Sequence, residues 1–181
     1  PQAPVFLAFL ETAARFNELV STNWADLDLR RRCLTLRATN TKNGRSRVIP
    51  LRDVLVRVLV DLRATHEVVL GRPPRDADRM FLSPQGLPWP GLSKPLLRIF
   101  WRVLERAAIA RIDANGAVLD LHALRHSAAT RLARAGVPIT HTQKLLGHSS
   151  IEVTQRYYLH LELDDLREAV ERVGGEPRRT A

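Results

Sequence analysis

The amino-acid sequence predicts a mainly α-helical protein with one small antiparallel β-sheet, that is, an α+β fold. Most of its 181 residues fall in segments whose apolar residues recur every three or four positions, the spacing of amphipathic helices. One segment, CLTLRATNTKNGRSRVIPL, instead alternates apolar and polar residues on either side of a turn. The length suits a single compact domain, alone or with an appendage.

The first half of the chain predicts two helices separated by a β-hairpin. Residues 4–21 have the apolar spacing of a helix. Leu34 and Leu36 alternate with polar neighbours in the first strand, TKNG has the composition of a turn, and RVIPL closes the second strand. Apolar positions between residues 51 and 62 then mark the second helix, with Asp53 near its start.

The next part of the chain predicts two longer helices. MFLS is a candidate third strand, and a helix is expected from about Leu92 to Ala110. After the turn at DANG, a helix over about residues 121–135 is ended by Gly136.

Two short helices follow. Pro138 lies in the first turn of one helix, and Gly147 ends it. The next begins at SSIE, where Ser149 and Glu152 have the spacing of a capping box. Two short helices around a turn also occur in helix-turn-helix modules, so this pattern alone does not separate a DNA-binding module from an enzyme.

The composition indicates a globular protein with an excess of positive charge. Hydrophobic residues make up 45% and charged residues 26%, and no apolar run is long enough to cross a bilayer, so we expect no membrane partner. The single Cys33 cannot form an intramolecular disulfide, which fits a cytoplasmic protein. A formal net charge of +9 favours nucleic acid as a partner, although arginines scattered over a solvated surface would give the same charge.

The segment LHALRHSAATRLARAG places His122 and Arg125 three residues apart in the first turn of a helix. Helix N-termini bind anions, so this pair is well placed to hold a phosphate, but a backbone-bonded His and a surface ion pair of the Arg explain it more simply when taken alone. His122 and His126 have metal-binding spacing. Because Ala123 stands where a metallohydrolase motif has Glu, and no third ligand is evident, we expect no metal and no cofactor.

The segment LGHSSIEVTQRYYLH contains the remaining candidates. His148 follows a helix-ending glycine, where its side chain can project from the turn. Tyr157 and Tyr158, the two tyrosines of the chain, lie about 100° apart on a helix, so at most one faces a given target. Buried tyrosines mostly pack with a hydrogen-bonded hydroxyl, whereas a nucleophilic tyrosine needs cationic neighbours or a base.

Together these segments resemble the C-terminal signature of the tyrosine recombinases, the phage integrase family. That signature is a His-x-x-Arg-His block, then LGHSS, then a tyrosine nine residues after the His of Gly-His. The chain has LHALRHSAATRLARAGVPITHTQKLLGHSSIEVTQRYY, in which this tyrosine is Tyr157. The family often has a His two residues past its tyrosine, and His160 stands two past Tyr158, so Tyr158 is the alternative.

Upstream segments extend the resemblance over nearly the whole chain. TAARFNELVSTNWADLDL resembles the family's first arginine block, with Arg15 at the arginine position and Ala13 and Ala14 in place of a Gly and its apolar neighbour. TKNGRSRVIPL resembles the β-hairpin whose turn carries the catalytic lysine, here Lys42. MFLSPQGLPWPGLSKPLLRIFWRVLERAAI matches the family's connecting segment more loosely.

The resemblance implies that six residues cleave a DNA phosphodiester: Arg15, Lys42, His122, Arg125, His148 and Tyr157. The two arginines and His148 would bind the non-bridging phosphate oxygens, where negative charge develops. The tyrosine would attack phosphorus and form a 3′-phosphotyrosyl enzyme. Lys42 would protonate the leaving 5′-oxygen, and His122 would help to take the tyrosine proton.

The resemblance also implies a domain organisation and partners. Residues 1–175 are expected to form the catalytic domain, and residues 176–181 a frayed tail. Because the opening residues already have helical spacing, we expect the family's N-terminal core-binding domain to be absent. Double-stranded DNA is the expected partner, with a homotetramer on DNA for the full-length protein and a monomer for the isolated domain. A segment from about Leu161 to Val173 would dock on a neighbouring protomer.

Two rival functions are weighed against this one. A helix-turn-helix module would have no use for the upstream Arg15, Lys42 and His122. A type IB topoisomerase shares the chemistry, but the LGHSS block and the small size favour a site-specific recombinase.

Overall fold

The structure is a computed structural model that describes residues 2–38, 44–114, 116–159 and 170. It is mainly helical with one three-stranded antiparallel sheet, as the sequence predicts. None of the described helices is long and apolar enough to span a membrane. The chain divides into two compact units, residues 1–128 and residues 129–181. The elements are α1 (Ala3–Thr12), α2 (Phe16–Val20), the 3-10 helix η1 (Trp24–Asp26), β1 (Leu27–Asp28), β2 (Cys33–Leu36), β3 (Arg47–Pro50), α3 (Asp53–Leu70), α4 (Lys94–Arg106), α5 (Leu121–Arg134), α6 (Ile139–Leu146) and α7 (Ile151–Tyr158).

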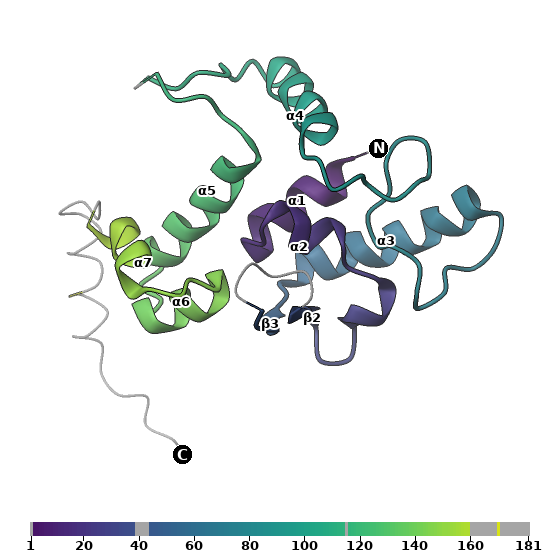
Figure 1. Ribbon diagram of the computed structural model, residues 1–181, viewed down its shortest axis with the longest axis horizontal. Helices are drawn as coiled ribbons and strands as arrows, with labels where there is room; N and C mark the ends of the chain where they lie inside the picture. Colours follow the sequence, from purple (N-terminus) through teal and green to yellow (C-terminus); the bar gives the residue numbers. More distant parts are fainter. Residues whose placement is uncertain (1, 39–43, 115, 160–169, 171–181) are drawn as a thin grey trace. The chain divides into compact units, whose positions relative to one another are not determined.

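The core of the first unit forms where α1 packs against α3 (Figure 1). On α3, Leu55 and Leu59 are fully buried, one helical turn apart, as the apolar spacing of this segment predicts. The ring of Phe6 on α1 lies 5.5 Å, centroid to centroid, from that of Phe100, which brings α4 onto the same core. Because α2 contacts α1, this core supports α2.

The sheet has the strand order β1-β2-β3, with every neighbouring pair antiparallel. In the β2–β3 ladder Leu34 pairs with Ile49 and Leu36 with Arg47. The predicted hairpin is therefore confirmed, although its turn at residues 39–43 lies outside the described residues. The predicted third strand at MFLS is wrong: the third strand is Leu27–Asp28, too short for any alternation to reveal it, and MFLS contributes one isolated bridge, from Leu82.

The single helix predicted over residues 4–21 is broken between α1 and α2. Ala13 has φ 51° and ψ 24°, the left-handed conformation, and its N–H donates to the carbonyl of Phe9 at 2.9 Å. The turn is held further by Thr12, whose hydroxyl donates to the Ala8 carbonyl at 2.6 Å and accepts from the N–H of Ala14 at 3.2 Å. A left-handed residue ends a helix, and apolar periodicity cannot reveal it because the apolar residues continue through the turn.

Replacing Ala13 with glycine tests this backbone conformation. The left-handed region costs a residue with a Cβ roughly 1–2 kcal/mol, and glycine does not bear this cost. Ala14 is equally buried but has no positive φ, so Ala14→Gly is a matched loss of one methyl group. We expect Ala13→Gly to be more stable than Ala14→Gly by about 1–2 kcal/mol in urea unfolding. Equal stabilities would contradict a left-handed Ala13.

The second unit contains the C-terminal part of α5 together with α6 and α7. Gly147, with φ 65°, ends α6 as predicted, and its N–H donates to the Gln143 carbonyl at 2.8 Å. The predicted capping box at Ser149 is wrong by one residue. Ser150 caps α7, and its hydroxyl accepts the N–H of Glu152 at 3.1 Å, because Ser150 is the residue with extended backbone angles immediately before the helix.

Candidate active site

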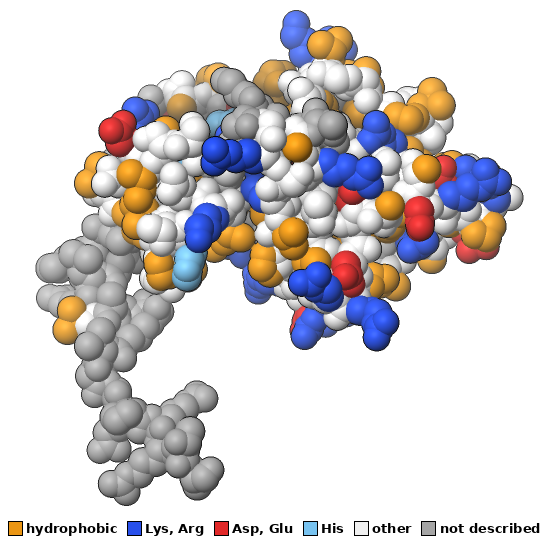
Figure 2. Space-filling view, turned by 60° about the horizontal axis from the view of Figure 1, so that its bottom comes forward, with side chains coloured by type: hydrophobic (Ala, Val, Ile, Leu, Met, Phe, Trp, Pro, Cys, Tyr) orange, Lys and Arg blue, Asp and Glu red, His pale blue; other side chains and the backbone are white. Residues whose placement is uncertain are grey.

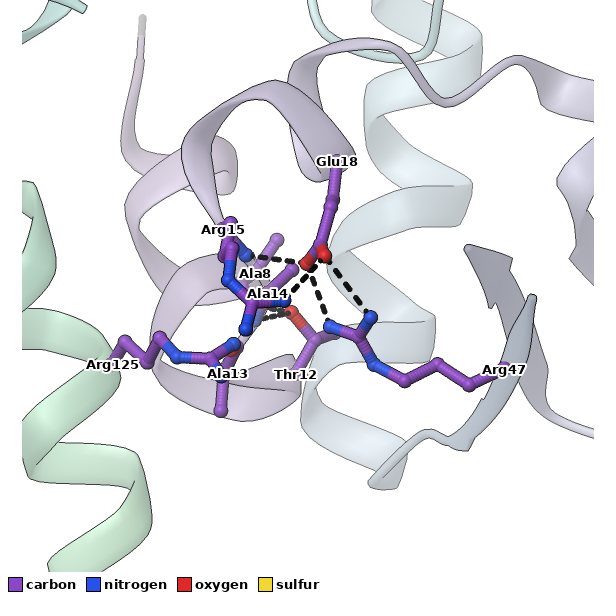
Figure 3. Close-up of polar contacts among 8 residues, drawn as sticks. All are labelled: Ala8, Thr12, Ala13, Ala14, Arg15, Glu18, Arg47 and Arg125. Carbon is purple, nitrogen blue, oxygen red and sulfur yellow. Dashed lines mark hydrogen bonds and ion pairs between the residues drawn. The ribbon is translucent and has the colours of Figure 1, made fainter. Parts of the chain in front are cut away.

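The carboxylate of Glu18 lies between the guanidinium groups of Arg15 and Arg47 (Figure 3). Its Oε1 accepts from Arg15 Nη1 at 2.8 Å and from Arg47 Nη1 at 3.1 Å. Its Oε2 accepts from Arg47 Nη2 at 2.6 Å and from the backbone N–H of Arg15 at 2.8 Å. One carboxylate therefore holds the side chain and the main chain of Arg15 at the start of α2 and ties strand β3 to both.

The three members of this cluster differ in exposure. The side chain of Glu18 is 1% exposed, that of Arg47 10%, and that of Arg15 28%. Burial raises the pKa of Glu18, but the hydrogen bonds and charges of Arg47 and Arg15 outweigh it and lower this pKa from 4.5 to about 2. Glu18 is thus a permanent buried anion, and Arg15 is the cation of the cluster that solvent and a ligand can reach best.

Arg125 is buried, with 2% of its surface exposed, although it is fully charged at any physiological pH. From α5 its Nη1 donates to the carbonyl of Ala13, the left-handed residue between α1 and α2 (Figure 3). The alternative that Arg125 forms a surface ion pair is therefore wrong. Its contact joins the first turn of α5 to the turn that carries Arg15, so the unit brings together two arginines that are 110 positions apart in the sequence.

A cavity of about 170 Å³ opens beside this cluster, and its lining includes Arg15, Ser93, Asp120 and His122. The carboxylate of Asp120 accepts the backbone N–H groups of His122 at 2.8 Å and Ala123 at 3.0 Å, which caps α5. This cap places His122 in the first turn of α5, and both His122 and Arg15 line the cavity. A guanidinium and an imidazole in the wall of one cavity form an arrangement suited to an anionic ligand.

The surroundings of His122 lower its pKa and so favour the neutral imidazole. Partial burial lowers its pKa from 6.5, and the nearby charges of His126 and Arg125 lower it further, while Asp120 opposes them. The rings of His122 and His126 meet edge to face at 5.0 Å. A neutral imidazole can accept a proton, which is what a base at this position needs. No group of three or more metal-ligating side chains occurs among the residues that the structure describes.

His148 and Tyr157 lie together in the second unit. His148 follows the glycine that ends α6, and its Nδ1 is 2.9 Å from the hydroxyl of Thr154 on α7. Its ring is nearly parallel to that of Tyr157, with a centroid separation of 6.4 Å and an interplanar angle of 14°. The turn and the helix thus present an imidazole and a phenol side by side.

Tyr158 has a different environment from its neighbour. Its hydroxyl donates to the carbonyl of Val137 and lies 2.7 Å from the hydroxyl of Thr142, which is fully buried on α6. This is the hydrogen-bonded packing role of an ordinary half-buried tyrosine. Tyr158 anchors α7 to the start of α6.

Removing the Tyr158 hydroxyl should therefore affect stability. In Tyr158→Phe the Val137 carbonyl and the Thr142 hydroxyl lose their partner, and we expect the free energy of unfolding to fall by about 1–3 kcal/mol. Urea unfolding monitored by circular dichroism measures the loss, and a Tyr158→Phe variant as stable as the wild type would contradict the anchoring role.

The six residues expected from the sequence divide between the two units. The first unit holds Arg15, His122 and Arg125, the second holds His148 and Tyr157, and Lys42 lies outside the described residues. Sequence reasoning assigned no role to Glu18 or to Arg47. The three-residue spacing of Arg15 and Glu18 was the available signal, because a Glu three residues after an N-cap residue can accept the backbone N–H of that residue.

Basic side chains predominate over acidic ones on the face of the molecule in Figure 2. Three exposed arginines are consecutive, Arg30 to Arg32, in the turn between β1 and β2. Several acidic side chains are paired with basic ones, as Asp53 is with Arg32 at 2.6 Å. Part of the positive charge of the chain is thus exposed at the surface.

Solved structures with the same fold include an integrase and a recombinase. The integrase of transposon Tn1549, solved in complex with transposon right end DNA, matches with a TM-score of 0.73 and 25% identity over 95% of this chain and 58% of that chain. The XerA recombinase matches with a TM-score of 0.72 over 97% of this chain and 59% of that chain, and its 24% identity shows the fold alone.

The chain belongs to the phage integrase family, whose sequence model matches residues 2–163. It is 35% identical over 172 residues to the tyrosine recombinase XerC of Roseiflexus sp., covering 93% of this chain and 49% of that protein. It is 34% identical over 168 residues to XerD of Mycobacterium tuberculosis, covering 92% and 49%. The chain spans less than half the length of these relatives. A match of this extent does not favour the helix-turn-helix alternative, which concerns residues 137–160.

Proposed function

We propose that the chain is the catalytic domain of a site-specific DNA recombinase, which cleaves and rejoins strands through a 3′-phosphotyrosyl intermediate. The observation that carries the proposal is the placement of Arg15, which Glu18 and Arg47 orient beside the cavity that His122 also lines. Membership of the phage integrase family supports it. We assign residues 1–175 to this domain and residues 176–181 to its tail.

In the proposed reaction the first unit binds the scissile phosphate. Arg15 and Arg125 donate to its non-bridging oxygens, where charge increases in the transition state. The buried position of Arg125 favours this role, because a desolvated guanidinium interacts more strongly with an anion than a solvated one does. His122, whose lowered pKa favours the neutral imidazole, accepts the proton of the attacking tyrosine and later returns it.

The second unit supplies the nucleophile. Tyr157 attacks phosphorus, its phenolic oxygen forms the new P–O bond, and the bond to the 5′-oxygen of the leaving strand breaks. His148 donates a hydrogen bond to a phosphate oxygen, and Lys42 protonates the departing 5′-oxygen. The engagement of the Tyr158 hydroxyl with Val137 supports the choice of Tyr157. The covalent intermediate keeps the energy of the broken bond, so rejoining needs no metal, ATP or other cofactor.

Double-stranded DNA is the proposed partner, and the cytoplasm the proposed location. The positive charge supports binding to DNA phosphates, which predicts affinity that falls steeply with salt. On DNA, the full-length protein is proposed to act as a homotetramer, whereas the isolated domain would be a monomer. The segment proposed to dock on a neighbouring protomer, residues 161–173, lies almost entirely outside the described residues.

A covalent DNA adduct tests this function. The protein is incubated with a nicked duplex, drawn from the DNA that flanks its gene, whose 5′-hydroxyl strand diffuses away after cleavage and so traps the intermediate. We expect an adduct on a denaturing gel from the wild type and from Tyr158→Phe, and none from Tyr157→Phe. Absence of any adduct, on a duplex that the protein binds, would count against the enzyme and in favour of a binding module.

A further inference from the structure

Thr154 contacts a residue of the proposed site without belonging to it. It lies on the first turn of α7, its surface is 0% exposed, and its Oγ1 is 2.9 Å from Nδ1 of His148. Both residues are in the second unit, so the contact does not depend on how the two units are arranged.

The backbone of His148 is held independently of this contact. Its N–H donates to the carbonyl of Gln143 at 3.2 Å, and its carbonyl accepts from the side-chain amide of Gln143 at 3.2 Å. Gln143 therefore positions the main chain of the turn. The imidazole ring contacts the hydroxyl of Thr154 and lies beside the ring of Tyr157.

The hydroxyl proton of Thr154 decides which nitrogen of His148 carries a hydrogen. Within the described part of the chain, the bond to His148 is the hydrogen bond that this hydroxyl makes. A buried donor left without an acceptor costs about 1–3 kcal/mol. The proton of Thr154 therefore points to Nδ1, which accepts it, and the neutral ring carries its own hydrogen on Nε2.

We propose that Thr154 is a positioning residue that sets the tautomer and the orientation of His148. With Nδ1 occupied as an acceptor, Nε2–H is a donor at neutral pH without the ring having to become a cation. The other neutral tautomer would present an unprotonated Nε2, whose lone pair would face an oxygen anion and repel it. The donation of Nε2–H to a phosphate oxygen rests on the proposed function. The hydrogen bond between Thr154 and His148 and the tautomer of His148 do not depend on that function.

Nitrogen NMR of the full chain reads the tautomer directly. Spectra are recorded at about pH 8, where an ordinary imidazole is neutral, and His148→Asn identifies the signals of His148. An unprotonated ring nitrogen resonates far downfield of a protonated one. We expect the wild type and Thr154→Ser to show Nδ1 unprotonated and Nε2 protonated, and Thr154→Val to show a mixture of both tautomers.

Thr142→Val is the matched control. It removes a fully buried threonine hydroxyl from the same unit, but that hydroxyl bonds Tyr158 and does not contact His148. The tautomer of His148 should be unchanged in it. A wild-type ring protonated on Nδ1, or the same tautomer ratio in Thr154→Val as in the wild type, would overturn the proposal. The wild-type spectrum alone decides the first point, even if Thr154→Val does not fold.

The rate of adduct formation connects the tautomer to the reaction. Loss of a hydrogen bond that orients a metal-ligating histidine costs 10–100-fold, and we expect a loss of that order in Thr154→Val, with recovery in Thr154→Ser. A changed tautomer with an unchanged rate would refute the positioning role. A wild type with the expected tautomer that forms no adduct on bound DNA would count against the proposed function and leave the Thr154–His148 assignment standing.

Discussion

Replacing Glu18 with glutamine is expected to lower the free energy of unfolding by about 3–5 kcal/mol. Glu18 is 1% exposed and accepts hydrogen bonds from Arg15 and Arg47. Glutamine keeps the size of the side chain but removes its charge, so Arg47, which is 10% exposed, loses the carboxylate charge that both of its Nη atoms bind. Urea unfolding at pH 7 measures the loss, and a loss below about 1 kcal/mol, the value of an exposed pair, would contradict the buried cluster.

The pH dependence of unfolding tests the same cluster. The pKa of Glu18 is about 2 in the folded chain and 4.5 as an ordinary carboxyl, so the unfolded state binds the proton more readily. The stabilisation is fully present above pH 4.5 and is lost as the pH falls from 4.5 to about 2, by a total of about 3 kcal/mol. Glu18→Gln should lack this part of the acid response. Parallel curves for the two proteins over this range would show that Glu18 is not the group responsible.

Replacing Arg15 with alanine is expected to slow adduct formation by about 10²–10³-fold, the cost of removing one donor to a developing oxyanion. Stability should change little, because Arg47 still pairs with Glu18 through both of its Nη atoms. Single-turnover cleavage of the trapping duplex measures the rate. Urea unfolding of the same preparation measures the stability.

Arg47→Met is the control for Arg15→Ala, because both arginines bind the carboxylate of Glu18 but only Arg15 lines the cavity. We expect Arg47→Met to lose more stability than Arg15→Ala, about 3 kcal/mol, and to slow adduct formation less than Arg15→Ala does. If Arg15→Ala proved the less stable variant and Arg47→Met the slower one, the division of the cluster into a ligand-binding and a structural arginine would be wrong.

The helices and the hairpin could be predicted because they rest on local patterns. Leu55 and Leu59 are buried at helical spacing, and Gly147 has the left-handed conformation that ends α6. The break at Ala13 could not be read in the same way, because an alanine gives no local signal for a positive φ. The strand Leu27–Asp28 exists only through its pairing with β2, which is a tertiary contact.

Within the site, the types of residue were predictable and their environments were not. The spacing of His122 and Arg125 was visible in the sequence, but burial of Arg125 against the carbonyl of Ala13 is a contact between residues 112 positions apart. Arg47 is one of three arginines in the hairpin segment, and nothing in its local sequence distinguishes it from the others. Its role depends on a carboxylate in another element, and a single sequence carries no record of such a pairing.

Identification of the modified tyrosine tests the central claim most directly. The trapped adduct is digested with nuclease and trypsin, and the peptide that follows Arg156, which contains both Tyr157 and Tyr158, is sequenced by fragmentation mass spectrometry. The account predicts a nucleotide esterified to Tyr157 and an unmodified Tyr158, whose hydroxyl is engaged with Val137 and Thr142. A nucleotide on Tyr158 would contradict the assignment and require α7 to release its anchor before cleavage.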